Sequence, residues 1–266
     1  ERRCYNELPL ISLHDVQPHV WIDYPHELAD LVSDDDPDDN LIRTKGEDIW
    51  QAVRDENVTP SKLEIDGDYY FPSARQLHLD SIRLGGLVSR DTDWHPDFMI
   101  ALWPGGVVCG LPVHEMYKYS LRKNNRQDFP PDHISVNTVP GRASYAADII
   151  GLHYLVDHIE SNDNVLIVDT TFRAGRLVND LIIRLKEALR RNLDHRRVRV
   201  ASVYWNPNDN STWTATPMVK KPHYYLKEVH QEVISPWDVH KLPNPRQDLK
   251  TLNPGLWKVL FEEWVG

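Results

Sequence analysis

The chain has 266 residues, of which 41% are hydrophobic and 26% charged, so it can bury one sizeable core, or one core plus a small appendage. Its formal net charge of −10 argues against a general nucleic-acid or membrane-surface binder, although a small anionic ligand needs only a local basic pocket. Two distant cysteines, the absence of an apolar run of about 18 residues and the absence of a signal-peptide pattern predict a soluble, cytoplasmic protein.

Residues 1–70 predict an irregular N-terminal extension that is rich in Pro, Trp and Asp. Its acidic run, residues 34–39, lacks the Gly and the terminal Glu of a calcium loop, so we interpret it as a solvated loop. Ile49, Trp50 and Val53 have the spacing of a short helix that ends before Pro60.

From residue 72 onward, predicted helices and strands alternate. The predicted helices cover residues 73–90, 107–121, 146–159 and 177–192, and the predicted strands cover residues 97–102, 133–139, 165–169 and 197–205. This alternation predicts an α/β fold with a mainly parallel sheet covered by helices on both faces. Ligands of such sheets bind beyond the carboxyl ends of the strands. Four segments are expected to meet there: residues 103–106, 144–145, 169–176 and Asn206.

The stretch from Val165 to Arg176 is the most informative part of the chain. Four branched apolar residues predict a strand that Asp169 closes, and a turn containing Gly175 leads into a helix. A strand, turn and helix of this kind direct backbone N–H groups and a helix N-terminus toward one point, which suits a phosphate. The turn has neither the Walker spacing nor the GxGxxG pattern, so those two phosphate folds are poorly supported.

This stretch resembles the signature of the type I phosphoribosyltransferases, most closely their purine-salvage branch, and the resemblance covers residues 72–240. It implies that an acidic pair holds the ribose hydroxyls of phosphoribosyl pyrophosphate (PRPP) and that the turn binds the 5′-phosphate. Asp169 keeps the first acid, whereas Thr170 replaces the second. Arg173 stands where the family has an Asp proposed to assist proton transfer, and Ala174 replaces a Thr. The resemblance therefore implies these roles: Asp169 and Arg173 catalytic; Thr171, Ala174, Gly175 and Arg176 phosphate-binding. Arg173 and Arg176 can add charge-assisted bonds in place of the missing hydroxyls.

A second match is the segment Trp103-Pro104-Gly105-Gly106, which looks like the pyrophosphate loop of the same family. That loop contains a cis peptide and exposes backbone donors, and an X-Pro bond adopts cis more readily than other bonds. The basic side chain of the family loop is missing here. The alternative is an ordinary strand-to-helix turn.

A third match lies in residues 221–225 and 233–238, which look like the hood that covers the base in the xanthine-guanine enzymes. Asn206, Tyr225 and Trp237 are then expected near the acceptor, with Asn206 in place of a lysine. Glu232 stands where the family has a stacking aromatic residue, and a carboxylate cannot stack on a base. Trp205 or Trp213 are alternative stacking partners, although either also fits simple packing.

Three further patterns concern a loop, the histidines and the C-terminal segment. Ser144 and Tyr145 resemble a pair in the family's mobile loop, but Ser144 alternatively caps the helix that follows. The 13 histidines form no HExxH motif, which argues against zinc. Residues 252–265 predict an amphipathic helix that packs on the core or on a second copy. The expected units are an extension (1–70), a phosphoribosyltransferase-like core (71–205) and a hood with a C-terminal helix (206–266).

By resemblance, the leading hypothesis is an enzyme that transfers a phosphoribosyl group between PRPP and a nitrogenous, nucleobase-like acceptor other than a standard purine. Mg²⁺ would bridge pyrophosphate and ribose, with Asp169 as its protein ligand. The alternatives are a non-catalytic sensor of PRPP or nucleotides, an inactive partner subunit, and an N-glycosidase acting on a nucleoside monophosphate. A homo-oligomer is expected.

Overall fold

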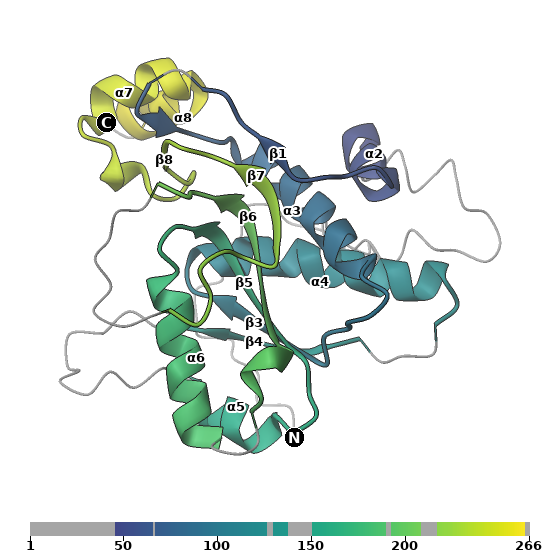
Figure 1. The fold of residues 1–266 in the computed structure, drawn as a ribbon. Helices are drawn as coiled ribbons and strands as arrows, with labels where there is room; N and C mark the ends of the chain where they lie inside the picture. Colours follow the sequence, from purple (N-terminus) through teal and green to yellow (C-terminus); the bar gives the residue numbers. More distant parts are fainter. Residues whose placement is uncertain are drawn as a thin grey trace, which may run out of the picture.

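The computed structural model describes residues 46–65, 67–126, 130–137, 151–189, 193–208 and 217–263. Its centre is a six-stranded sheet in the order β1-β7-β6-β5-β3-β4, and every neighbouring pair in it is parallel (Figure 1). The strands of this sheet are β1 (Ser61–Lys62), β3 (Phe98–Leu102), β4 (Asp132–Val136), β5 (Val165–Phe172), β6 (Val198–Trp205) and β7 (Tyr224–Glu228). The predicted α/β fold with a mainly parallel sheet is confirmed.

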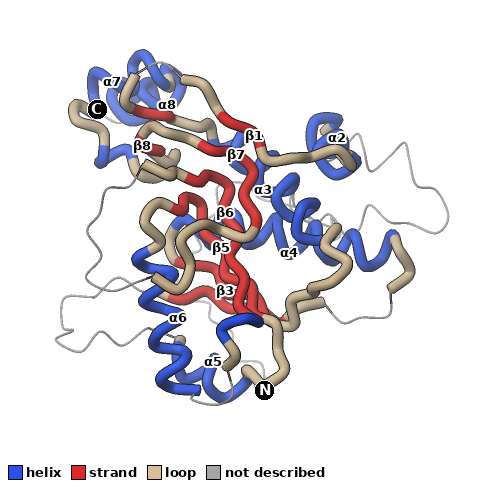
Figure 2. Tube along the Cα trace, in the orientation of Figure 1, coloured by secondary structure: helices blue, strands red, loops and turns tan. Residues whose placement is uncertain are grey.

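Helices cover both faces of this sheet, as Figures 1 and 2 show. The helices around the sheet are α2 (Glu47–Arg54), α3 (Ala74–Ser89), α4 (Gly105–Lys123), α5 (Leu152–His158) and α6 (Arg176–Leu189), with a 3-10 turn η3 (His195–Arg197) before β6. One buried core joins the sheet to α5 and α6, and a second joins its other face to α3 and α4. Ser73 caps α3 as predicted, because its Oγ accepts a hydrogen bond of 3.0 Å from the Gln76 N–H. None of the helices in the described ranges is long and apolar enough to cross a bilayer.

A smaller unit, which we call the hood, stands beside the sheet. It is built from β2 (Tyr69–Tyr70), β8 (Glu232–Val233), η4 (Val239–Lys241), α7 (Pro245–Leu252), α8 (Pro254–Lys258) and a π-helical turn η5 (Val259–Glu263). β2 pairs with β8, and a core of Ile234, Leu242 and Leu249 holds the unit together. The segment that we assigned to an extension thus supplies β1 to the main sheet and β2 to the hood. The division of the chain at residues 70 and 205 remains a prediction.

The bounds of several predicted elements differ from the structure. β5 does not end at Asp169 but runs to Phe172, because Thr171 and Phe172 continue the ladder with β6 and β-branched threonines suit a strand. The predicted C-terminal helix begins at Pro254 rather than at Leu252, and α7 precedes it. Asn253 separates the two helices, since its Oδ1 accepts from the Leu256 N–H at 3.1 Å and so starts a new helix.

Candidate functional site

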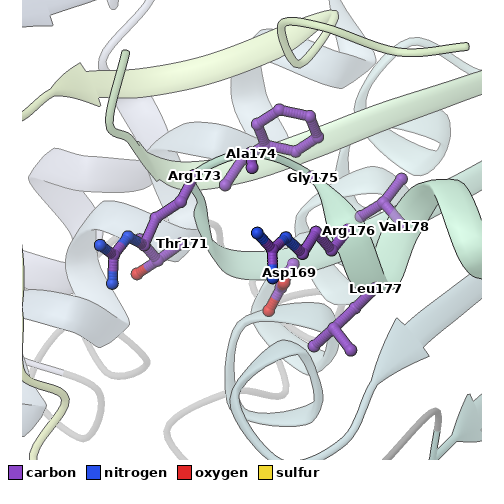
Figure 3. A pocket seen from close by; sticks show the side chains of 9 residues that line it. Asp169, Thr171, Arg173, Ala174, Gly175, Arg176, Leu177 and Val178 are labelled. Carbon is purple, nitrogen blue, oxygen red and sulfur yellow. The ribbon is translucent and has the colours of Figure 1, made fainter. Parts of the chain in front are cut away.

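A pocket of about 420 Å³ opens at the carboxyl end of β5 (Figure 3). Its lining consists of Asp169, Thr171, Phe172, Arg173, Ala174, Gly175, Arg176, Leu177 and Val178. The structure thus brings together, around one cavity, every residue that the sequence placed in the phosphate turn. Asp169, which the sequence placed beside the ribose, borders the same cavity.

The turn between β5 and α6 depends on Gly175. Its φ is +66°, and a Cβ added to it would lie 2.3 Å from Cζ of Phe172, so only glycine fits. Asn179 fixes the turn from inside α6: its Nδ2 donates to the carbonyls of Gly175 (2.8 Å) and Val219 (2.9 Å). Its Oδ1 accepts from the Val219 N–H at 2.9 Å. Because α6 begins at Arg176, helix geometry leaves its first N–H groups facing the pocket without partners inside the helix.

The glycine loop after β3 packs against the same end of β5. The Trp103–Pro104 peptide bond is cis, as the resemblance implied. Gly105 and Gly106 are the first two residues of α4, so this helix starts earlier than predicted and its N-terminal N–H groups belong to the loop. A Cβ on Gly106 would lie 2.3 Å from the Val168 carbonyl oxygen, and one on Gly105 would lie 2.6 Å from Thr170 Oγ1. The loop therefore approaches β5 as closely as the backbone allows.

Asp169 lies close to the start of both helices: its Cα is 3.3 Å from where a Gly106 Cβ would be, and its side chain lines the pocket with Arg176. Burial raises the pKa of its carboxyl to about 7, against the lowering effects of a hydrogen bond from the Thr170 N–H (2.7 Å) and of the positive charge on Lys241. The carboxyl is therefore able to hold or release a proton near neutrality, or to take a cation in exchange for that proton.

The two threonines after Asp169 point in different directions. Thr170 is buried on the α4 side, where its Oγ1 lies 3.4 Å from Cys109 Sγ, so it does not present a donor to the pocket in place of the missing second acid. Burial raises the pKa of the Cys109 thiol to about 12, which keeps it neutral. Thr171 lines the pocket, and its Oγ1 is a buried atom with no hydrogen-bond partner among the described residues. A buried hydroxyl of this kind is costly unless a ligand or water pairs with it.

Arg173 reaches across to the hood. Its Nη1 lies 3.6 Å from Oε1 of Glu232, and the two side chains are 50% and 46% exposed. Both positions depart from the family pattern that the sequence resembles. Arg173 stands in place of an Asp proposed to assist proton transfer, and Glu232 stands in place of an aromatic residue that stacks on the base. The structure shows that the two departures form one ion pair.

The three residues predicted to lie near the acceptor, Asn206, Tyr225 and Trp237, do not line one common pocket. The Asn206 side chain is engaged within the protein, donating to the Gln231 carbonyl and accepting from the Asn208 N–H, both at 2.9 Å. Tyr225 packs edge-on against Trp205, with ring centroids 4.9 Å apart, and Lys221 Nζ lies over both rings.

Trp237, by contrast, reaches the loop: its Cζ2 is 3.3 Å from where a Gly105 Cβ would be. Ser144, Tyr145 and Trp213 lie outside the described residues, so the predicted mobile loop and that alternative stacking partner remain predictions. In the described ranges, no group of three or more His, Cys, Asp or Glu side chains is arranged to hold a metal ion.

A parallel sheet with a glycine loop after β3, a glycine turn after β5 and a small hood is the architecture that the sequence resemblance implies. The fold is phosphoribosyltransferase-like. No family model matches the chain, and no curated protein matches its sequence.

Solved structures of similar fold include a purine phosphoribosyltransferase from Pyrococcus horikoshii Ot3 (14% identity, 67% of this chain and 98% of that chain, TM-score 0.45). A hypothetical protein from Neisseria gonorrhoeae with bound ppGpp is 15% identical over 72% of this chain and 99% of that chain, with a TM-score of 0.47. The xanthine-guanine-hypoxanthine phosphoribosyltransferase of Helicobacter pylori is 14% identical over 69% and 99%, with a TM-score of 0.38. Likenesses at this level of identity concern the fold alone.

Proposed function

We propose that this protein binds PRPP in the pocket at the end of β5 and transfers its phosphoribosyl group to a nitrogenous, nucleobase-like acceptor. The observation that carries the proposal is the approach of two helix N-termini to Asp169. α4 begins at Gly105, and its Gly106 packs against the backbone of Asp169; α6 begins at Arg176, which lines the pocket together with Asp169. Each N-terminus favours an anion, and PRPP carries one anionic group at each end of its ribose.

The residues divide between the parts of this ligand. The N–H groups at the start of α6, together with Thr171 Oγ1, Arg173 and Arg176, are proposed to bind the 5′-phosphate. Asp169 is proposed to hold the ribose hydroxyls, and the N–H groups of Gly105 and Gly106 to bind the diphosphate. Thr171 supports this division because its hydroxyl is buried, lines the pocket and is without a partner in the described chain.

The protein groups at this point could hold Mg²⁺ only if the bound ligand supplies further oxygen atoms. One carboxyl, Asp169, is available at this point, and Mg²⁺ commonly binds through one or two carboxylates plus phosphate oxygens of the substrate. When bound there, Mg²⁺ would neutralise charge on the diphosphate. Because the pKa of Asp169 is about 7, the carboxyl would lose its proton when it takes the cation.

In the reaction, the bond between C1 of the ribose and the diphosphate oxygen breaks, and its electron pair leaves with the diphosphate. A nitrogen of the acceptor bonds to C1 and loses its proton. Arg173 is a cation and accepts no proton, so its role in this scheme is to stabilise negative charge on the ligand. Glu232, which pairs with Arg173, is the carboxylate on the acceptor side that can take that proton. Catalysis then rests on positioning and electrostatics.

One observation favours a second function, a PRPP or nucleotide sensor that binds without turnover. The Arg173–Glu232 ion pair stands where the family's proton-transfer and stacking groups would be. A protein with an intact phosphate turn, but with an ion pair at the place of the acceptor, would bind PRPP and would not transfer its phosphoribosyl group.

A single experiment separates the two functions. The purified chain is incubated with PRPP, Mg²⁺ and a panel of nucleobases, and diphosphate release is measured beside PRPP binding. Release with one acceptor supports the transferase. Binding without release under every acceptor supports the sensor, and in that case the double variant Arg173→Asp/Glu232→Trp is expected to gain release with a purine. Absence of PRPP binding contradicts the transferase and a PRPP sensor.

A further inference from the structure

Arg173 belongs to the pocket and contacts the hood at the same time. Its side chain lines the cavity at the end of β5, as Figure 3 shows. Its Nη1 also lies 3.6 Å from Oε1 of Glu232, which is the first residue of β8 in the hood. A phosphate in the turn and the carboxylate of Glu232 would both bind through the N–H donors of this one guanidinium.

The backbone is fixed on both sides of this ion pair. Phe172, directly before Arg173, is buried, and its carbonyl accepts from the Asn206 N–H at 2.9 Å. The Glu232 N–H donates to the Asp68 carbonyl at 3.0 Å, and β8 pairs with β2. The two side chains, however, are about half exposed. Rotation of these side chains is therefore enough to open the contact, and neither the sheet nor the hood has to move.

A phosphate is a stronger partner for Arg173 than Glu232 is. The distance of 3.6 Å is too long for a hydrogen bond, and exposed ion pairs of this kind contribute little to stability. A phosphate carries more negative charge than one carboxylate, and it can accept two parallel N–H bonds from a guanidinium. It would also repel the carboxylate of Glu232. Phosphate binding is therefore expected to draw Arg173 away from Glu232.

We propose that Glu232 competes with the phosphate of the ligand for Arg173, so that the Arg173–Glu232 ion pair is an autoinhibitory contact that phosphate binding breaks. This inference rests on the proposed function, because it places the phosphate in the turn after β5. It applies to the transferase and to the sensor alike. In the transferase, Glu232 becomes free to take the proton of the acceptor only after the donor has bound. In the sensor, the same exchange frees a carboxylate of the hood for another partner.

The sign of one substitution tests this competition. Isothermal titration calorimetry with Mg²⁺ measures ribose 5-phosphate and PRPP binding to the wild type, Glu232→Gln, Arg173→Ala and the double variant, with the exposed Glu187→Gln as the control for net charge. Glu232→Gln is expected to tighten the binding of both ligands about threefold, or about 0.7 kcal/mol, because it removes the competitor. In the Arg173→Ala background the same substitution should change the affinity less than about 1.5-fold, since the contested cation is gone. Glu187→Gln should also stay within that limit.

Failure of this inference and failure of the proposed function look different. If the wild type binds the ligands and Glu232→Gln binds them equally or more weakly, Glu232 is not a competitor, and the inference is overturned while the phosphate turn stands. An equal gain with and without Arg173 would show a general effect of charge and would overturn it as well. If the wild type binds neither ligand, the proposed function is overturned, and the competition with it.

Discussion

Replacing Asp169 with asparagine is expected to stabilise the ligand-free protein above neutral pH. The carboxyl has a pKa near 3.8 in the unfolded chain and about 7 in the folded protein, because folding buries it. Below about pH 4 it is protonated in both states and burial carries no charge penalty. Between pH 4 and 7 only the unfolded state ionises, so folding stability falls as the pH rises, and above pH 7 the loss is complete.

The structure sets the size of this effect. A rise of about three pKa units corresponds to at most about 4 kcal/mol. Since Asp169 is only partly buried and borders an open pocket, we expect about 1–2 kcal/mol, or an increase in Tm of a few degrees for a chain of this length. Asparagine keeps the hydrogen bond from the Thr170 N–H, which an alanine would lose.

Urea denaturation at pH 5, 6, 7 and 8 measures the effect, with Glu187→Gln on the exposed side of α6 as a control for net charge. The advantage of Asp169→Asn over the wild type should be smallest at pH 5 and largest at pH 8, and Glu187→Gln should show no such trend. The same variant should bind PRPP with Mg²⁺ more weakly, since the ionised carboxyl is what the ligand uses. A variant that is no more stable at pH 8, or equally more stable at every pH, would refute the reasoning.

Two further predictions concern the turn and its ion pair. Gly175→Ala should destabilise the protein by at least about 2 kcal/mol, because the new Cβ has an unfavourable φ and meets the Phe172 ring. Gly67→Ala, where φ is +94° and no atom lies within 4 Å, should lose only about 1 kcal/mol in the same denaturation experiment, and equal losses would contradict the packing argument. Arg173→Ala should change folding stability by less than about 1 kcal/mol, because its pair with Glu232 is half exposed. In calorimetry it should weaken ribose 5-phosphate binding about tenfold, and unchanged binding would show that Arg173 serves only the ion pair.

The sequence predicted the parts of the site that depend on local chemistry. The apolar run before Asp169, the glycine in the turn and the Trp103-Pro104 pair each define a short-range conformation, and the structure has all three. The capped helix that begins after Ser73 belongs to the same class.

Features that depend on distant residues were not predictable. Arg173 and Glu232 were each recognised as departures from the family pattern, but only the fold brings them within 3.6 Å. Asn179 gave a weak signal, a polar residue on the apolar face of a helix, and its partner Val219 is 40 residues away. The extension of β5 past Asp169 was missed because threonine suits both a turn and a strand.

The measurement that tests the account most directly is a calorimetric titration of PRPP with Mg²⁺ into the wild type, Asp169→Ala and Glu187→Gln. Saturable binding to one site is expected in the wild type and in Glu187→Gln, and loss of binding in Asp169→Ala. At a PRPP concentration 100 times the Kd, the unfolding free energy of the wild type is expected to rise by roughly 2.7 kcal/mol. No binding to the wild type, or equal binding to Asp169→Ala, would contradict the assignment of this pocket to PRPP.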